Sequence, residues 1–287
     1  LSGGYGAHNV ILSLGLSFTN FSLRKMFDKN AWTPLPAGDG QTLSLRAQTS
    51  GKEYQSYSLS FIEPWLGGHK PNSLSVSTYY TRQNGGISAD GTLAELGIIG
   101  ASVGLGKRLK WPDDYFFMNL TASYQQYNLH NWYNRGFSFA NGLSNEYALQ
   151  MRFARRSIAE PFWITQGSET GVTIKATPPF SLFHPDVDYT EMVPAEQYKL
   201  VEFYKWKFTS QWFTKLTNSK SKHDLVLMGR IGFGYLGSYS DRKGDSPFER
   251  FYLGGSGLTG FQLDGREIIA LRGYDDGSLS PTDGSFI

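Results

Sequence analysis

Three glycines late in the chain have the spacing of a dinucleotide-binding loop. Gly232, Gly234 and Gly237 match GxGxxG, and an alternating strand pattern precedes them. In such a loop the glycines let the backbone approach a pyrophosphate at the start of a helix. Residues 238–247 instead contain Gly, Pro and closely spaced polar side chains that cannot begin that helix. We therefore interpret these glycines as small residues of a strand.

Other groups that could perform catalysis also lack the required spacing. The run from Gly254 to Gly257 does not have the GxSxG spacing of a nucleophile elbow. The histidines fall in predicted turns or strand ends without metal-ligand spacing; they are His8, His69, His130, His184 and His223. Two pairs of adjacent aspartates, at 113–114 and 275–276, are read as solvated loop residues, with loop calcium as the alternative. The sequence thus predicts no enzyme, no metal site and no cofactor, although spacing alone leaves open a Ser–His pair that meets only in space.

The composition excludes several classes of protein. Among 287 residues, 27 Lys+Arg face 25 Asp+Glu, a formal net charge of +2. A chain so nearly neutral attracts phosphate weakly, so we expect no nucleic-acid partner. The aromatic content of 15% argues against disorder. No apolar run approaches the roughly 20 residues of a membrane-spanning helix, and the lack of cysteine excludes a disulfide scaffold.

Alternation with a period of two dominates the chain. From residue 10 to 19, apolar side chains alternate with small or polar ones, and residues two apart share one face of a β-strand. The pattern recurs at 42–48, 56–61, 73–81, 116–125, 147–156, 172–177 and 225–234. It is less clean at 96–109, and at 198–214, where Glu202 and Lys205 stand among aromatic residues. With a stub at 1–6, the sequence predicts about eleven strands and no long helix.

Two architectures could bury such strands. A soluble sandwich would turn the apolar faces into its core, whereas an outer-membrane barrel would turn them toward lipid and line its lumen with the polar faces. The predicted strands have about 10 or more residues, the length of a tilted bilayer crossing, while soluble strands typically have about 5–6. We therefore predict an all-β fold, a transmembrane antiparallel up-and-down β-barrel in the outer membrane.

The tryptophans support the barrel. Trp65, Trp111 and Trp163 follow the predicted fourth, sixth and eighth strands, Trp212 lies near the end of the tenth, and Trp32 lies in the linker after the second. In an up-and-down barrel the ends of even strands lie at one rim, so these rings would gather at one membrane interface.

The connections also differ between the two rims. Those after odd strands, at 84–94, 128–142, 179–196 and from 237 onward, are predicted to be outer loops. The linker 20–40 on the other rim is either a short amphipathic turn at the membrane surface or an ordered loop.

Five basic residues occupy the polar faces of the predicted strands: Arg46, Arg152, Arg156, Lys175 and Arg230. They could line an anion-selective pore. We favour the alternative, in which they pair with carboxylates inside the barrel.

Two stretches carry a resemblance to a known family. The first runs from Phe61 through Glu63, Pro64 and Trp65 to Ser75; the second contains the Gly-Gly pair at 254–255, the run 268–274 and a Ser-Pro pair at 280–281. Together they resemble BamA, the family of outer-membrane protein assembly insertases, in a form similar to that of Bacteroidota. Leu271 replaces the usual Val or Ile before the Arg. The resemblance covers essentially the whole chain.

The resemblance implies a partial barrel that uses no nucleotide. The family has about sixteen strands, so residues 1–287 would be an incomplete barrel domain without its last strands or its N-terminal periplasmic modules. Residues 237–287 would form a loop that folds back into the lumen. There Arg272 would bind a carboxylate of the barrel wall, and Gly273 and Tyr274 would fix the turn.

The first strand is the other functional element that the resemblance implies. Gly3, Gly4, Tyr5 and Gly6 would form a poorly paired edge that templates an incoming strand. The expected partners are client outer-membrane proteins, accessory subunits of an assembly complex and outer-membrane lipid. A two-partner secretion pore of the same superfamily, or a simple outer-membrane porin or enzyme, is the alternative.

Overall fold

The structure is a computed structural model. It describes residues 2–6, 9–32, 34–68, 70–87, 91–132, 137–159, 162–217, 224–255, 265–275 and 277–280, with side chains from residue 12 onward.

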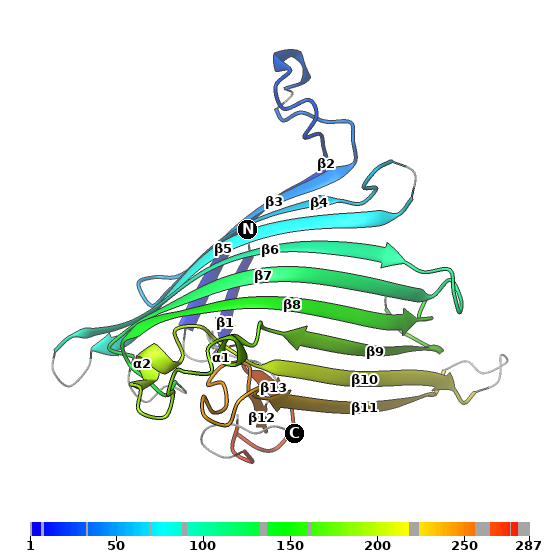
Figure 1. The fold of residues 1–287 in the computed structure, drawn as a ribbon. Helices are drawn as coiled ribbons and strands as arrows, with labels where there is room; N and C mark the ends of the chain where they lie inside the picture. Colours follow the sequence, from blue (N-terminus) through cyan, green and yellow to red (C-terminus); the bar gives the residue numbers. More distant parts are fainter. Residues whose placement is uncertain are drawn as a thin grey trace.

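In the described part of the chain, eleven strands form one sheet in chain order, from β1 to β11 (Figure 1). Their bounds are β1 Ser2–Gly6, β2 Asn9–Phe21, β3 Gln41–Ser50, β4 Tyr54–Glu63, β5 Asn72–Ile87, β6 Leu93–Arg108, β7 Phe116–His130, β8 Gly142–Arg156, β9 Gly167–Ala176, β10 Tyr204–Lys215 and β11 Val226–Gly237. All neighbours in this sheet are antiparallel. Within the described residues β1 and β11 are its edges. The prediction of about eleven up-and-down strands is confirmed.

Several strands extend further than their alternation indicated. The predicted loops 84–94 and 128–142 are wrong at their ends, because β5 continues to Ile87, β6 begins at Leu93 and β7 continues to His130. Polar residues at these strand ends hide the alternation, but the backbone ladder does not depend on it. Arg82 and Glu95, for example, form a cross-strand ion pair of 2.6 Å where β5 meets β6. Conversely, β10 begins only at Tyr204, so 198–203 is connection rather than strand.

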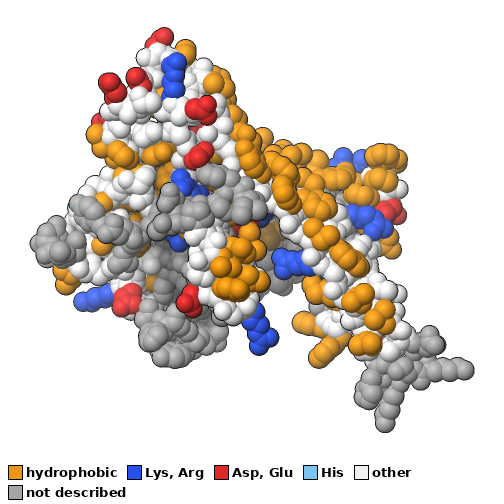
Figure 2. All heavy atoms as spheres, turned by 90° about the horizontal axis from the view of Figure 1, so that it is seen from below, with side chains coloured by type: hydrophobic (Ala, Val, Ile, Leu, Met, Phe, Trp, Pro, Cys, Tyr) orange, Lys and Arg blue, Asp and Glu red, His pale blue; other side chains and the backbone are white. Residues whose placement is uncertain are grey.

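The sheet has two chemically different faces. On the face that we call outer, large apolar side chains are exposed along the strands, among them Leu14, Leu149 and Phe233, each at least half exposed. Figure 2 shows hydrophobic side chains gathered along one side of the molecule. Soluble monomers rarely expose apolar patches larger than a few hundred Å². The outer face is therefore suited to lipid.

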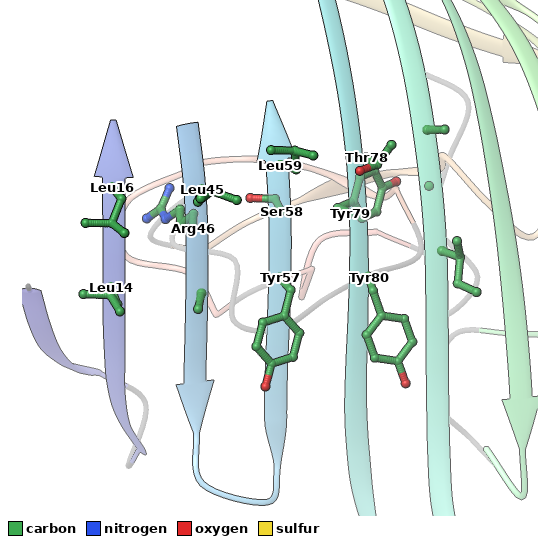
Figure 3. Close-up of a pocket in the computed structure, with 14 residues that line it drawn as sticks. Leu14, Leu16, Leu45, Arg46, Tyr57, Ser58, Leu59, Thr78, Tyr79 and Tyr80 are labelled. Carbon is green, nitrogen blue, oxygen red and sulfur yellow. The ribbon is translucent and has the colours of Figure 1, made fainter. Parts of the chain in front are cut away.

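A shallow pocket of about 560 Å³ lies mainly on the outer face of β2–β6 (Figure 3). Its apolar lining comes from side chains two residues apart on adjacent strands; they include Leu14, Leu16, Leu45, Tyr57, Leu59, Tyr80 and Ile99. The apolar surface thus continues across the strands next to β1.

The opposite, inner face carries a buried cluster near the ends of the odd-numbered strands. Leu96 and Ile98 of β6, Tyr127 of β7 and Leu236 of β11 contribute to it. Connecting segments cover these side chains with Trp132, Phe139, Val201, Phe203, Phe248 and Phe251. The chain that follows β11 therefore packs against the inner face.

Within the described residues, helical structure is limited to single turns. These are η1 Lys29–Ala31, α1 Phe180–Phe183 and α2 Pro194–Gln197. Among the described residues no helix combines the length and apolar character needed to cross a bilayer. Two short strands, β12 Phe251–Leu253 and β13 Glu267–Ile269, pair in parallel apart from the main sheet.

The two faces lead to a test by charge insertion. Leu149→Arg, midway along β8 on the outer face, should lower the free energy of unfolding in phospholipid vesicles by about 2–4 kcal/mol. Ser123→Arg is the matched control, because Ser123 lies on the inner face of β7 opposite Ala148. Denaturant titration of both variants measures the difference. Equal losses would contradict the assignment of the outer face to lipid.

Candidate functional site

Charged side chains gather on the inner face of three adjacent strands. Glu146 comes from β8, Lys175 from β9, and Lys205 and Lys207 from β10. Strand register brings them together, because Lys175 stands opposite Lys205 on β10 and opposite Gln150 on β8. Two lysines side by side in a buried place need carboxylates nearby.

The segment after β11 supplies those carboxylates. Glu249 Oε1 lies 2.7 Å from Lys175 Nζ, and Glu249 Oε2 lies 2.8 Å from Lys205 Nζ. Lys205 Nζ also donates to the backbone carbonyl of Glu249 at 2.9 Å. Glu267 Oε1 is 3.0 Å from Lys205 Nζ and 2.9 Å from Lys207 Nζ. We call these contacts, together with Lys175–Glu146 at 2.6 Å, the ionic anchor.

The charges of the ionic anchor balance. Three ammonium groups, of Lys175, Lys205 and Lys207, face three carboxylates, of Glu146, Glu249 and Glu267. The fully buried Glu146 touches Lys175 only as an ion pair, since neither of its oxygens has a hydrogen bond of good geometry within the described residues. Removing one partner of a buried pair leaves an uncompensated charge, which costs about 3–5 kcal/mol.

Burial and charge oppose each other at Glu249. Burial alone would raise the pKa of its carboxyl, but the ammonium groups of Lys175 and Lys205 outweigh burial and hold the pKa below its ordinary value. Glu249 also has a positive φ of 64°, which is unusual for a residue with a side chain. The contacts of its carboxylate offset the cost of that backbone conformation.

Aromatic rings enclose the ionic anchor. Phe248 is fully buried, and its ring centroid lies 4.5 Å from that of Tyr127 on β7. Lys175 Nζ sits over the ring of Phe203 at 5.4 Å, and Lys205 Nζ over that of Phe251 at 4.7 Å. Such contacts strengthen when water is excluded, so apolar packing and ion pairing fix the same segment.

A second buried ion pair joins two connections at the same end of the sheet. Lys243 Nζ, after β11, lies 3.0 Å from Glu202 Oε2, before β10. Lys243 also donates to the carbonyl of Leu200 at 2.8 Å, and Glu202 accepts from the backbone N–H of Ser181 at 2.9 Å. The chain after β11 is thus held both by the sheet and by the 177–203 connection.

The predicted pairing of inward cations is confirmed for three of the five. Arg152 lies 2.9 Å and Arg156 3.7 Å from Glu169, and Lys175 belongs to the ionic anchor. Arg46 and Arg230 have no ion pair with any described residue.

The predicted Arg-Gly-Tyr turn is described, but its tip is not part of the ionic anchor. Arg272 is exposed and has no ion pair with the described residues, and Tyr274 is about half exposed. Gly273 has φ of 92°, where a side chain would be strained. A different arginine of this segment, Arg266, has an aromatic contact: its guanidinium lies 4.5 Å from the centre of the ring of Tyr252 in β12. The lumen contact of Arg272 stays a prediction.

The Glu-Pro-Trp turn closes the hairpin between β4 and β5. Glu63 Oε1 accepts from the backbone N–H of Trp65 at 2.9 Å, and Glu63 Oε2 accepts from Gln41 Nε2 at 2.7 Å. Pro64 follows in the turn and has no N–H that would need a partner. The side chain of Glu63 therefore shapes this turn and ties it to β3.

The tryptophans lie where the parity of the strands predicted. Trp65, Trp111 and Trp163 are exposed in connections after β4, β6 and β8, Trp212 lies near the end of β10, and Trp32 follows β2. In a sheet of consecutive antiparallel strands, the even-numbered strands all end on the same side. We call this side, where strands end, the even edge; it is distinct from the edge strands β1 and β11. Their contact with a membrane interface stays a prediction.

The first strand is short and pairs only with β2 among the described residues. Gly3, Gly4, Tyr5 and Gly6 stand opposite Leu12, Ile11, Val10 and Asn9. Nothing is described on the other side of β1. Three glycines in a five-residue strand weaken its pairing.

Sequence reasoning missed most of the ionic anchor. Glu146 lies just before the predicted strand 147–156, and Glu249 and Glu267 lie in a segment without periodicity. The one available signal was the break at 198–214, where Glu202 and Lys205 interrupt aromatic residues. Both side chains are buried, and each is ion-paired with the chain after β11.

Removal of one anchor carboxylate should loosen the segment after β11. Glu249→Gln leaves Lys175 and Lys205 with too little negative charge, so local opening should become easier by about 3–5 kcal/mol. Hydrogen exchange of the amides at Gly254 and Glu267, which bond to Ile269 and Arg250, measures this opening. The exposed Glu191 provides the control Glu191→Gln. Unchanged exchange in Glu249→Gln would contradict the anchor.

Acid should loosen the same segment. The pKa of Glu249 is lower in the folded chain than in the unfolded chain. The ionised carboxylate therefore contributes its full stabilisation of the segment above the unfolded pKa of about 4.3. This stabilisation is lost as pH falls through the folded pKa. The difference in opening free energy between the native chain and Glu249→Gln should therefore shrink below about pH 4. Exchange at graded pH measures it, and a constant difference down to acid pH would refute this role of the carboxylate.

Comparisons with known proteins place this geometry in a family. Residues 37–286 match the Omp85 superfamily domain. The fold is similar to the crystal structure of BamA from Haemophilus ducreyi lacking POTRA domains 1–3, with a TM-score of 0.57 and 17% sequence identity. The match covers 95% of this chain and 44% of that chain, so the chain spans less than half of that structure. No curated protein matches the chain. The sheet corresponds to part of an outer-membrane β-barrel, and the chain belongs to the Omp85 superfamily.

Proposed function

We propose that the protein is an outer-membrane assembly insertase, which folds client β-barrel proteins into the membrane by templating their strands on β1. The superfamily comprises non-enzymatic transport and assembly proteins, and the proposal needs no nucleotide. Its clients would be outer-membrane proteins, its accessory partners the subunits of an assembly complex, and its surroundings the lipid of a multi-pass barrel.

The observation that carries the proposal is the short, glycine-rich first strand, β1. An unpaired edge presents N–H and C=O groups that can bind a further strand. β1 pairs with β2 over only five residues, Ser2–Gly6, three of which are glycine. By contrast, β5 and β6 each have 16 residues. A client strand could therefore compete for or extend β1 at little energetic cost.

The segment after β11 has a supporting role in this proposal. The ionic anchor holds its base on β8–β10, so its exposed Arg-Gly-Tyr turn is carried by a fixed base. We propose that Arg272 binds a carboxylate outside the described residues, with Gly273 and Tyr274 setting the turn. Residues 237–287 would then be the in-folding loop of the barrel.

A backbone substitution in β1 tests the templating. Gly4→Pro removes one backbone donor from the strand, and losing one hydrogen bond of about 0.5–1.5 kcal/mol should slow client assembly roughly two- to tenfold. Gly4→Ala keeps the donor and serves as the control. The measurement is the rate at which a radiolabelled client becomes heat-modifiable in proteoliposomes.

Two outcomes would count against the proposal. Wild-type assembly by Gly4→Pro, in a variant that is itself folded, would remove the role of β1. If Gly4→Pro left assembly unchanged but slowed the release of a secreted substrate, while Gly4→Ala did neither, the two-partner secretion pore would take its place.

A further inference from the structure

The connection between β2 and β3 is unlike the others at the even edge. It spans residues 22–40, whereas β4–β5 is joined by 64–71 and β6–β7 by 109–115. Figure 1 shows it projecting beyond the end of β2, away from the other strands. Neither the ionic anchor nor β1 explains such a projection.

This connection is held in a defined shape by its own hydrogen bonds. The backbone N–H of Ser22 donates to the carbonyl of Pro36 at 2.9 Å, and that of Gly38 to Asn20 at 3.0 Å. The fully buried Ser22 donates through Oγ to Asp39 Oδ2 at 2.6 Å. At its base the ring of Phe21 packs edge-on against that of Phe61, with centroids 6.3 Å apart. These contacts give the projecting connection a defined structure.

Its apolar side chains nevertheless face outward. Phe27 is 94% exposed, and Leu23, Met26 and Trp32 are each more than 40% exposed. Trp32 donates through Nε1 to the carbonyl of Met26 at 3.1 Å, which holds the indole beside the turn. A turn that is fixed by hydrogen bonds while it exposes four large apolar groups requires an apolar environment.

Basic side chains accompany these apolar groups. Arg24, Lys25 and Lys29 lie in the same stretch with a single carboxylate, that of Asp28. Asp28 Oδ1 accepts from the backbone N–H of Asn30 at 3.0 Å. Arg24 and Lys29 are exposed and have no ion pair within the described residues. Apolar rings beside unpaired cations are the chemistry of a segment that lies on an anionic lipid surface.

The position of the segment agrees with this chemistry. It leaves the sheet at the even edge, which also carries the exposed Trp65, Trp111 and Trp163. Trp and Tyr favour the interface between lipid and water. Leu14 and Leu16 of β2 and Leu45 of β3 lie on the apolar outer face of the two strands that this connection joins (Figure 3).

We propose that residues 22–32 form a membrane anchor, inserting Leu23, Met26, Phe27 and Trp32 into the lipid leaflet at the even edge while Arg24 and Lys29 contact anionic headgroups. Because β2 continues directly into this anchor and pairs with β1, the anchor sets the depth of the β1–β2 edge in the bilayer. The inference rests on the outer-membrane placement of the chain and not on the insertase proposal.

Site-specific quenching tests the anchor. The chain has no cysteine, so Phe27→Cys can carry one environment-sensitive fluorophore in the full protein, reconstituted in nanodiscs that contain phosphatidylglycerol. Lipids with a spin label near the headgroup should quench the fluorophore at position 27 severalfold more than the same fluorophore at Glu191→Cys. Glu191 is exposed in the 177–203 connection.

Charge variants separate the sources of binding. Arg24→Gln with Lys29→Gln should lower the ratio of inserted to released label by about fivefold per charge, and only in nanodiscs with anionic lipid. Lys25 is left intact because it donates to the carbonyl of Ala37. Equal quenching at positions 27 and 191 would overturn the proposal. A second result would also overturn it: the fluorophore at position 27 is shielded from solvent in native membranes but is not quenched by the spin-labelled lipids. That result would indicate a protein partner.

Discussion

The backbone hydrogen-bond ladder is the constraint on which the rest of the structure depends. An antiparallel ladder satisfies the main chain without help from side chains, and it sends successive side chains to opposite faces. The sequence uses this by placing leucine, valine and aromatic groups on one face and small or polar groups on the other. That division turns an apolar face toward lipid while leaving a polar face on which charges can be paired.

The strands are held by many contacts near β8–β10 and by few at β1. Near β8–β10, buried ion pairs and aromatic packing act on the same segment, so its release requires both to break. At β1, only five residues, three of them glycine, pair with β2 within the described part of the chain. The proposed templating would use this asymmetry, because a client strand would exchange with a weakly paired strand while the rest of the frame stays folded.

The sequence predicts what depends on local pattern. Alternation identified eight of the eleven strands and their faces, and strand parity placed Trp65, Trp111 and Trp163 at one edge. The partners of the lysines could not be predicted, because Glu249 and Glu267 reach Lys175 and Lys205 across long stretches of chain whose path no local pattern sets. Strand ends such as 82–87 were also missed, since polar side chains there, among them the ion pair of Arg82 with Glu95, replace apolar alternation.

Photo-crosslinking from β1 tests the central claim most directly. A crosslinking residue at position 4, in the full protein with an arrested client, should react with the terminal strand of the client. Moving it along positions 3 to 6 should shift the crosslink along that strand, as a paired register requires. Crosslinks that form only within the protein, with or without client, would contradict templating by β1.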